Sequence, residues 1–94
     1  MARNADVTLA AGTWTQLTAD DATVVAIQNK SDYIVTVMAT TSATPPSASA
    51  RDGYVLRPLA DGQYTLATSF PGLTSPVRMY AYSEYAVTVF VSHD

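Results

Sequence analysis

The sequence predicts an all-β protein, namely a small antiparallel β-sandwich or a jelly-roll-like barrel of about eight short strands. Ala, Thr and Val are the commonest residues, and Thr and Val favour strands. No long window rich in Leu, Glu, Lys and Ala shows a helical period. Instead, short apolar and β-branched runs recur at roughly ten-residue spacing, separated by turn residues.

Length and composition predict one compact domain over residues 1–94. A chain of 94 residues can bury roughly 60–70% of the surface that its unfolded form exposes. The composition, 48% hydrophobic and 14% charged, is far from that of disordered chains. A weakly charged surface also repels its neighbours little, which favours association.

The first quarter of the chain predicts a flexible lead-in followed by two short strands. Residues 1–4 are expected to form the lead-in, and Val7 to Ala10 the first strand. Residues 13–17 alternate clearly and predict a second strand. Its Trp14 is expected to pack in the core or at its rim, with a ligand platform as the alternative.

The stretch from Val24 to Thr41 is expected to organise the core as a hairpin that reverses at residues 29–32. Both faces of its second arm carry apolar residues, so the second face should be covered by another sheet, a loop or another subunit. Residues 42–52 follow as an exposed loop rich in Pro, Ser and Ala. This loop is interpreted either as flexible or as an arm that settles against a neighbour.

The second half predicts shorter strands and a closing hairpin. Residues 53–57 form a strand that Pro58 ends, and the Asp61-Gly62 pair is the strongest turn signal in the chain. Another strand is expected over residues 64–68. The final hairpin spans residues 77–93, with apolar residues alternating along both arms.

Charge and sequence signals exclude several classes of partner. The net charge is −3, and the five basic residues are spread singly, so neither nucleic acid nor an anionic membrane is an expected partner. No stretch approaches transmembrane length, and the first ten residues lack the apolar run of a signal peptide. We therefore expect synthesis in a cytoplasm.

The residues suited to catalysis are sparse, so the sequence predicts no enzyme, no cofactor and no metal. The chain has no Cys, and its one His, at position 93, is expected to fray with the C-terminus. The adjacent carboxylates Asp20 and Asp21 lack further oxygen ligands at regular spacing. The glycines are dispersed and form no phosphate-binding loop.

Six tyrosines in so short a chain are the main functional signal. They can be ordinary half-buried strand aromatics, part of a protein interface, or platforms that stack on sugar rings. The candidate interface residues are Ile34, Met38, Pro45, Pro46, Tyr80, Tyr82 and Phe90, several of which should become buried only on assembly. The candidate sugar-stacking residues are Trp14, Tyr54 and Tyr64.

Seven short motifs occur in a characteristic order: Val7 to Leu9, Thr13 to Leu17, Ala26 to Asn29, Tyr33 to Val37, Ala43 to Pro46, Phe70 to Gly72 and Val77 to His93. In this order the chain resembles, over nearly its whole length, small bacteriophage virion proteins encoded among head and tail genes. The resemblance implies a non-enzymatic capsid decoration or cement protein.

The resemblance also implies partners and a location. The protein would act as a homo-oligomer, a dimer or trimer, bound to the major capsid protein or another virion protein on the capsid surface. The alternatives are a carbohydrate- or receptor-binding module of a head or tail fibre and a minor head–tail component.

Overall fold

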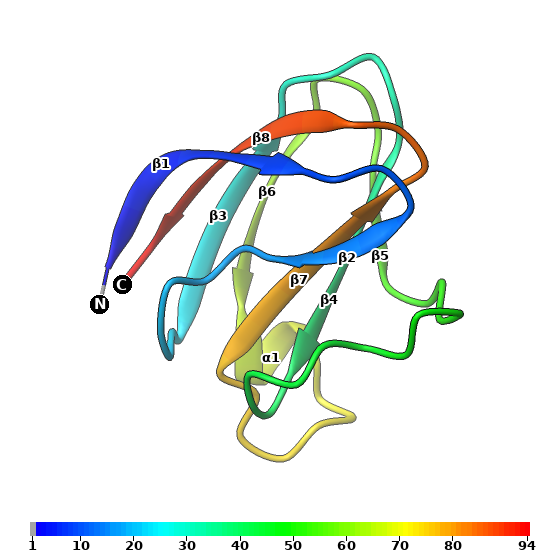
Figure 1. Cartoon of the computed structure of the whole chain (residues 1–94). Coiled ribbons are helices and arrows are strands. Elements are labelled where there is room, and N and C mark those ends of the chain that lie inside the picture. The colour runs from blue at the N-terminus through cyan, green and yellow to red at the C-terminus, as the bar shows by residue number, and fades with distance from the viewer. Residues whose placement is uncertain (1) are drawn as a thin grey trace.

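The computed structural model describes residues 2–94, which form eight strands and one short helix (Figure 1). All strand pairs are antiparallel. The elements are β1 (Arg3–Leu9), β2 (Thr13–Gln16), β3 (Val24–Asn29), β4 (Val35–Thr40), β5 (Tyr54–Leu56), β6 (Asp61–Thr65), α1 (Leu66–Ser69), β7 (Arg78–Ser83) and β8 (Val87–His93). Within residues 2–94 no helix is long and apolar enough to cross a membrane.

The strands form two four-stranded sheets that face each other. The first sheet has the order β1-β8-β3-β6 and the second has the order β2-β7-β4-β5. β1 pairs with β8, β2 with β7, β3 with β6 and β4 with β5. These are the pairs of one long hairpin wrapped into two layers, which is the topology of a jelly roll. The predicted small antiparallel sandwich is therefore confirmed.

The two predicted hairpins are wrong, although their strands exist. β3 lies in the first sheet and β4 in the second, and β7 and β8 are divided in the same way. Both connections therefore cross from one sheet to the other. Alternation of side chains shows which residues face the core but does not say which strand is the neighbour.

The core lies between the sheets and is built by this alternation. In β8, for example, Val87, Val89 and Val91 point inward and are buried, while the residues between them point outward. Each fully buried Val, Leu or Ile stabilises the fold by about 1.5–3 kcal/mol. The buried apolar cluster contains Leu9, Leu17, Ala22, Val25, Ile27, Val35, Val37, Ala39, Leu56, Leu66, Met79, Ala81, Val87, Val89 and Val91.

The flexible lead-in expected over residues 1–4 is wrong where the structure describes it. Arg3 and Asn4 belong to β1, where they pair with His93 and Ser92. Arg3 also donates from Nη1 to the backbone oxygen of Leu17 at 2.8 Å. Met1 lies outside the described residues.

The β5–β6 reversal does not use the Asp61-Gly62 pair. It lies at residues 57–60, where Leu59 adopts a positive φ of 62° and the Ala60 N–H donates to the Arg57 oxygen. Gly62 sits within β6, close under the Tyr64 hydroxyl. The strand expected over residues 64–68 likewise ends at Thr65 and is followed by α1.

The C-terminal strand is well anchored, so the expectation that His93 frays is wrong. His93 is buried at the end of β8, and its Nε2 accepts a hydrogen bond from the Ala19 N–H at 2.9 Å. The adjacent Asp94 carboxylate accepts hydrogen bonds from the Thr23 hydroxyl and from the N–H groups of Thr23 and Val24. These bonds, led by that of the Thr23 hydroxyl, lower the pKa of Asp94 to about 2.

The Asp94→Asn variant should therefore be less stable than the wild type at pH 7 but not at pH 2. The pKa of Asp94 is about 2 in the folded chain and 3.8 as its ordinary value. Its stabilising contribution is thus complete above pH 3.8 and is lost as the pH falls through 2. Thermal unfolding of both proteins at the two pH values measures this. The exposed Asp52→Asn is the matched control, and an equal difference at both pH values would contradict the prediction.

Candidate functional site

The outer face of the second sheet is covered over β2 and β7 by the chain's own loop, residues 41–53, which we call the cover loop. It joins β4 to β5 and runs back over the sheet (Figure 1). The Tyr80 hydroxyl donates to the Ala43 oxygen, and the Trp14 Nε1–H donates to the Ala50 oxygen at 3.1 Å. The Arg51 guanidinium lies 3.9 Å from the centre of the Tyr82 ring, a cation–π contact. The expectation that the second face of β4 is covered is therefore confirmed in part, since Thr36, Met38 and Thr40 are half-buried whereas Ile34 is 57% exposed.

The cover loop changes the interpretation of the predicted interface residues. Tyr80 and Tyr82 are only 3% and 8% exposed within one chain, so they are already buried in the monomer, before any assembly. Met38 is half-buried on the same sheet face, whereas Ile34 is 57% exposed beyond the loop. On the cover loop itself, Pro45 is exposed and Pro46 half-buried.

Phe90 lies on the opposite side of the molecule from these residues. It points outward from the first sheet, because Val89 and Val91 on either side of it face the core. The seven predicted interface residues therefore do not form one surface.

The predicted sugar-stacking residues are separated as well. Trp14 lies beside Tyr82, with ring centres 5.6 Å apart. Tyr54 and Tyr64 instead pack with Phe70 in another aromatic cluster, where burial raises the pKa of Tyr64. The three residues do not line a common groove.

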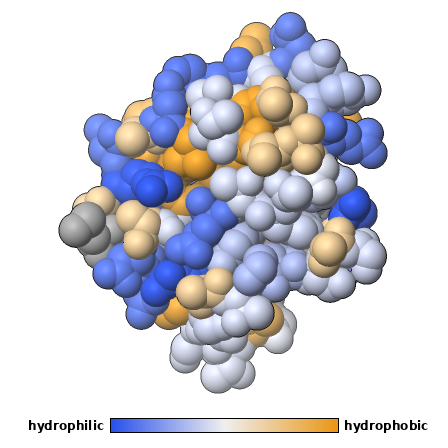
Figure 2. Space-filling model, in the orientation of Figure 1, coloured by the Kyte–Doolittle hydropathy of each residue, from blue (hydrophilic) through white to orange (hydrophobic). Residues whose placement is uncertain are grey.

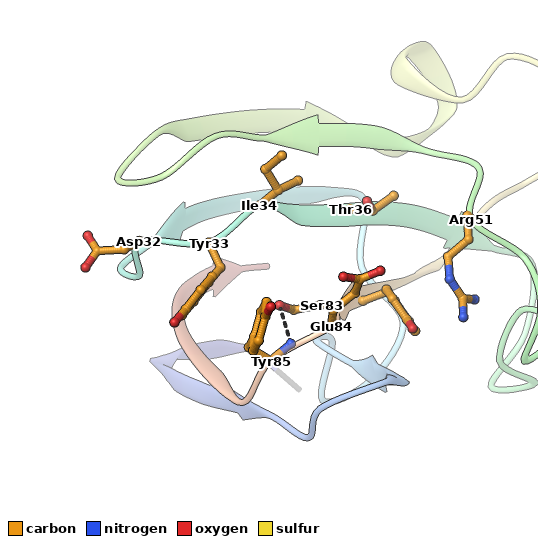
Figure 3. Close-up of a pocket in the computed structure, with 9 residues that line it drawn as sticks. Asp32, Tyr33, Ile34, Thr36, Arg51, Ser83, Glu84 and Tyr85 are labelled. Atoms are coloured by element: carbon orange, nitrogen blue, oxygen red, sulfur yellow. Dashed lines mark hydrogen bonds between the residues drawn. The ribbon is translucent and has the colours of Figure 1, made fainter.

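The structure brings a different set of tyrosines together around a surface groove of about 580 Å³, which we call the tyrosine groove (Figure 3). Tyr33 and Tyr85 stack there, with ring centres 4.2 Å apart and planes inclined by 25°. They are 46% and 52% exposed, respectively. The groove is lined by Asp32, Tyr33, Ile34, Thr36, Arg51, Tyr82, Ser83, Glu84 and Tyr85.

A buried asparagine holds the β3–β4 side of the groove in place. Asn29 Nδ2 donates to the backbone oxygens of Tyr33, Leu56 and Arg57, at 2.6, 3.3 and 3.2 Å. Its Oδ1 accepts hydrogen bonds from the backbone and hydroxyl of Ser31. The backbone that carries Tyr33 is therefore tied to the end of β5, and a fixed backbone favours a preformed site.

The β7–β8 turn supplies the other side of the groove. The Tyr85 N–H donates to the Ser83 hydroxyl oxygen at 3.2 Å (Figure 3, dashed line). Figure 3 shows Glu84 and Ser83 between the tyrosine pair and Arg51, while Asp32 points away at the rim. Arg51 is anchored because its Nη1 donates to the oxygens of Ala48 and Ala50. Within residues 2–94, neither Asp32 nor Glu84 takes part in an ion pair.

The charged side chains elsewhere do not form a metal site in the part of the chain described. Among residues 2–94, no group of three or more His, Asp or Glu side chains is placed to hold an ion. Asp21, part of the adjacent carboxylate pair, instead binds Arg78 Nε at 2.8 Å. The neighbouring Asp20 is also in reach of Arg78, at 3.4 Å.

Sequence reasoning missed Tyr33, Glu84 and Tyr85 as a site, although it noted the number of tyrosines. The structure places Tyr33 and Tyr85 in connections, whereas the sequence predicted both within the arms of hairpins. A large aromatic side chain in a connection is less readily covered by a neighbouring strand than one within a sheet. No family model, curated protein or solved structure matches the chain.

Proposed function

We propose that the protein is a non-enzymatic structural component of a bacteriophage virion, a decoration or cement protein that binds the assembled head. The observation that carries this proposal is the uncovered outer face of the first sheet, with Phe90 at its centre. The resemblance of the sequence to small virion proteins points in the same direction. A jelly roll is also an architecture of viral capsid domains.

The Phe90 face has the character of a contact surface. Phe90 lies opposite Asp6 of β1 on one side and Gln28 of β3 on the other. Small residues surround it, among them Ala26 and Ser92, and every outward-facing residue of the sheet is exposed or half-buried. A shallow depression of about 330 Å³ lies beside the ring. A flat face with one aromatic anchor suits docking on a regular lattice.

The low charge of the surface is consistent with this role. In Figure 2 the largest strongly hydrophobic area lies in the upper part of the visible face, with hydrophilic residues on both sides of it. Such a surface can stay dispersed before assembly and still approach a partner without strong repulsion. The proposal includes a dimer or trimer, which suits the two-fold and three-fold positions of a shell.

Analytical ultracentrifugation tests the proposal with phage heads that lack the protein. We expect the wild type to sediment as a dimer or trimer alone and to bind the heads. Phe90→Lys should weaken head binding at least tenfold, because a central aromatic anchor typically carries 1–2 kcal/mol or more of the binding energy. The matched control is Val55→Lys, which changes a more exposed residue on the other sheet and should bind normally.

Three results would each overturn a different part of the proposal. Failure of the wild type to bind heads would reject the decoration function. Normal binding by a folded Phe90→Lys protein would reject the Phe90 face, and a monomer at every concentration would reject the oligomer. The alternative, a carbohydrate- or receptor-binding module, rests on the tyrosine groove, a separate surface.

A further inference from the structure

We infer that the tyrosine groove is a binding site for a neutral saccharide, which packs on the Tyr33–Tyr85 pair and is held by Glu84 and Arg51. This inference does not depend on attachment to a phage head. It rests on ring faces, hydrogen-bonding groups and charges that meet in one preformed groove.

The aromatic pair provides the apolar part of the site. Because Tyr33 and Tyr85 stack on each other, one face of each ring contacts the partner ring and the other face is not part of this contact. Both side chains remain about half exposed, and both line the groove, so aromatic surface is available to a ligand there. The face of an aromatic ring is electronegative and attracts the weakly positive C–H groups on one side of a hexopyranose ring.

The polar part of the site matches the hydroxyl groups of a sugar. The Glu84 carboxylate can accept two hydrogen bonds from neighbouring hydroxyls, and the Arg51 guanidinium has further N–H groups to donate. The hydroxyls of Ser83 and Thr36 lie in the same groove. The volume of about 580 Å³ falls within the range of roughly 300–1,000 Å³ found for small-ligand sites.

The charges of the groove disfavour an anionic ligand. Two carboxylates, Asp32 and Glu84, oppose the single cation Arg51, so a phosphate or an acidic sugar would be repelled. Arg51 lies over the Tyr82 ring, so that ring already has a cation on it. A polyhydroxyl ligand uses acceptors and donors together and brings no charge of its own into the groove.

An NMR titration of the isolated protein tests this inference, using cellobiose, lactose and methyl α-mannoside as probes. We expect at least one of them to shift the amide signals of Tyr33, Glu84 and Tyr85 saturably, with a millimolar dissociation constant. Tyr85→Ala should weaken binding at least tenfold through loss of a ring face. Glu84→Gln, which changes only an exposed side chain, should weaken it several-fold.

Tyr54→Ala is the matched control, because Tyr54 is similarly exposed but belongs to the other aromatic cluster. It should bind the same sugar with unchanged affinity, as should Phe90→Lys. The inference is overturned if none of the three probes binds, if the shifts map to Tyr54 and Tyr64, or if both groove variants keep the wild-type affinity. Binding of tetralysine at the groove in place of the sugars would instead identify an acidic docking site.

Discussion

Replacing Asn29 with aspartate is expected to lower the free energy of unfolding by about 3 kcal/mol. The side chain is fully buried, and its Nδ2 donates to three backbone oxygens at once. A carboxylate of the same shape has no N–H to donate and would bring a negative charge against those oxygens. Leaving buried acceptors without donors costs about 1–3 kcal/mol, and more where a charged group is left unpaired.

Urea unfolding at pH 7 measures this loss, and Asn4→Asp on the exposed outer face of β1 is the matched control. The control should stay within about 0.5 kcal/mol of the wild type, as surface substitutions usually do. The same Asn29 variant should also broaden the NMR signal of Tyr33, since its backbone loses an anchor. A loss below 1 kcal/mol would show that the Asn29 hydrogen bonds do not hold this connection.

The Gly53→Ala variant is expected to be destabilised by about 3 kcal/mol or more. Gly53 ends the cover loop with a φ of +137°, a conformation that residues with a Cβ rarely adopt. A Cβ built there would lie 2.2 Å from the Val37 carbonyl oxygen, and this neighbour is backbone of β4. The backbone of β4 cannot move away without breaking its pairing with β5. The steric strain is therefore not relieved by a small shift.

Thermal and urea unfolding test this prediction against Gly72→Ala, where a Cβ meets no atom within 4 Å. The control should stay within about 1 kcal/mol of the wild type, because only the entropy of the unfolded chain changes. If Gly53→Ala equals the control in stability, the close approach of Gly53 to Val37 is not a feature of the folded protein in solution.

The fold class could be predicted because it depends on local patterns. Val residues at every second position in β4 and β8, with Thr between them, specify strands and their inward faces, and turn residues separate the strands. Pairing depends on contacts far apart in the sequence. The polar residues 29–32 look like a hairpin turn, yet the chain crosses here between the sheets. The Asn29 side chain is buried and binds backbone oxygens at the end of β5.

The candidate site was less accessible to prediction for the same reason. The tyrosine groove joins side chains from the β3–β4 connection, the β7–β8 turn and the cover loop. Nothing in the local sequence around Tyr33 indicates that Tyr85 will stack on it. The cover loop likewise carries Ala43 and Ala50, whose backbone oxygens accept hydrogen bonds from Tyr80 and Trp14. Every residue has a backbone oxygen, so the sequence does not show which of them will accept such a bond.

The position of β8 also has a consequence for the order of folding. β8 is the last strand of the chain, yet it lies between β1 and β3 in the first sheet. Until it is inserted, β1 lacks the strand that pairs with it, because within residues 2–94 β8 is its only partner in that sheet. A nascent chain on a ribosome can therefore complete this layer only after synthesis has reached residues 87–93. Such long-range pairing is slow, and the protein should fold on the millisecond-to-second scale, roughly, once the whole chain is free.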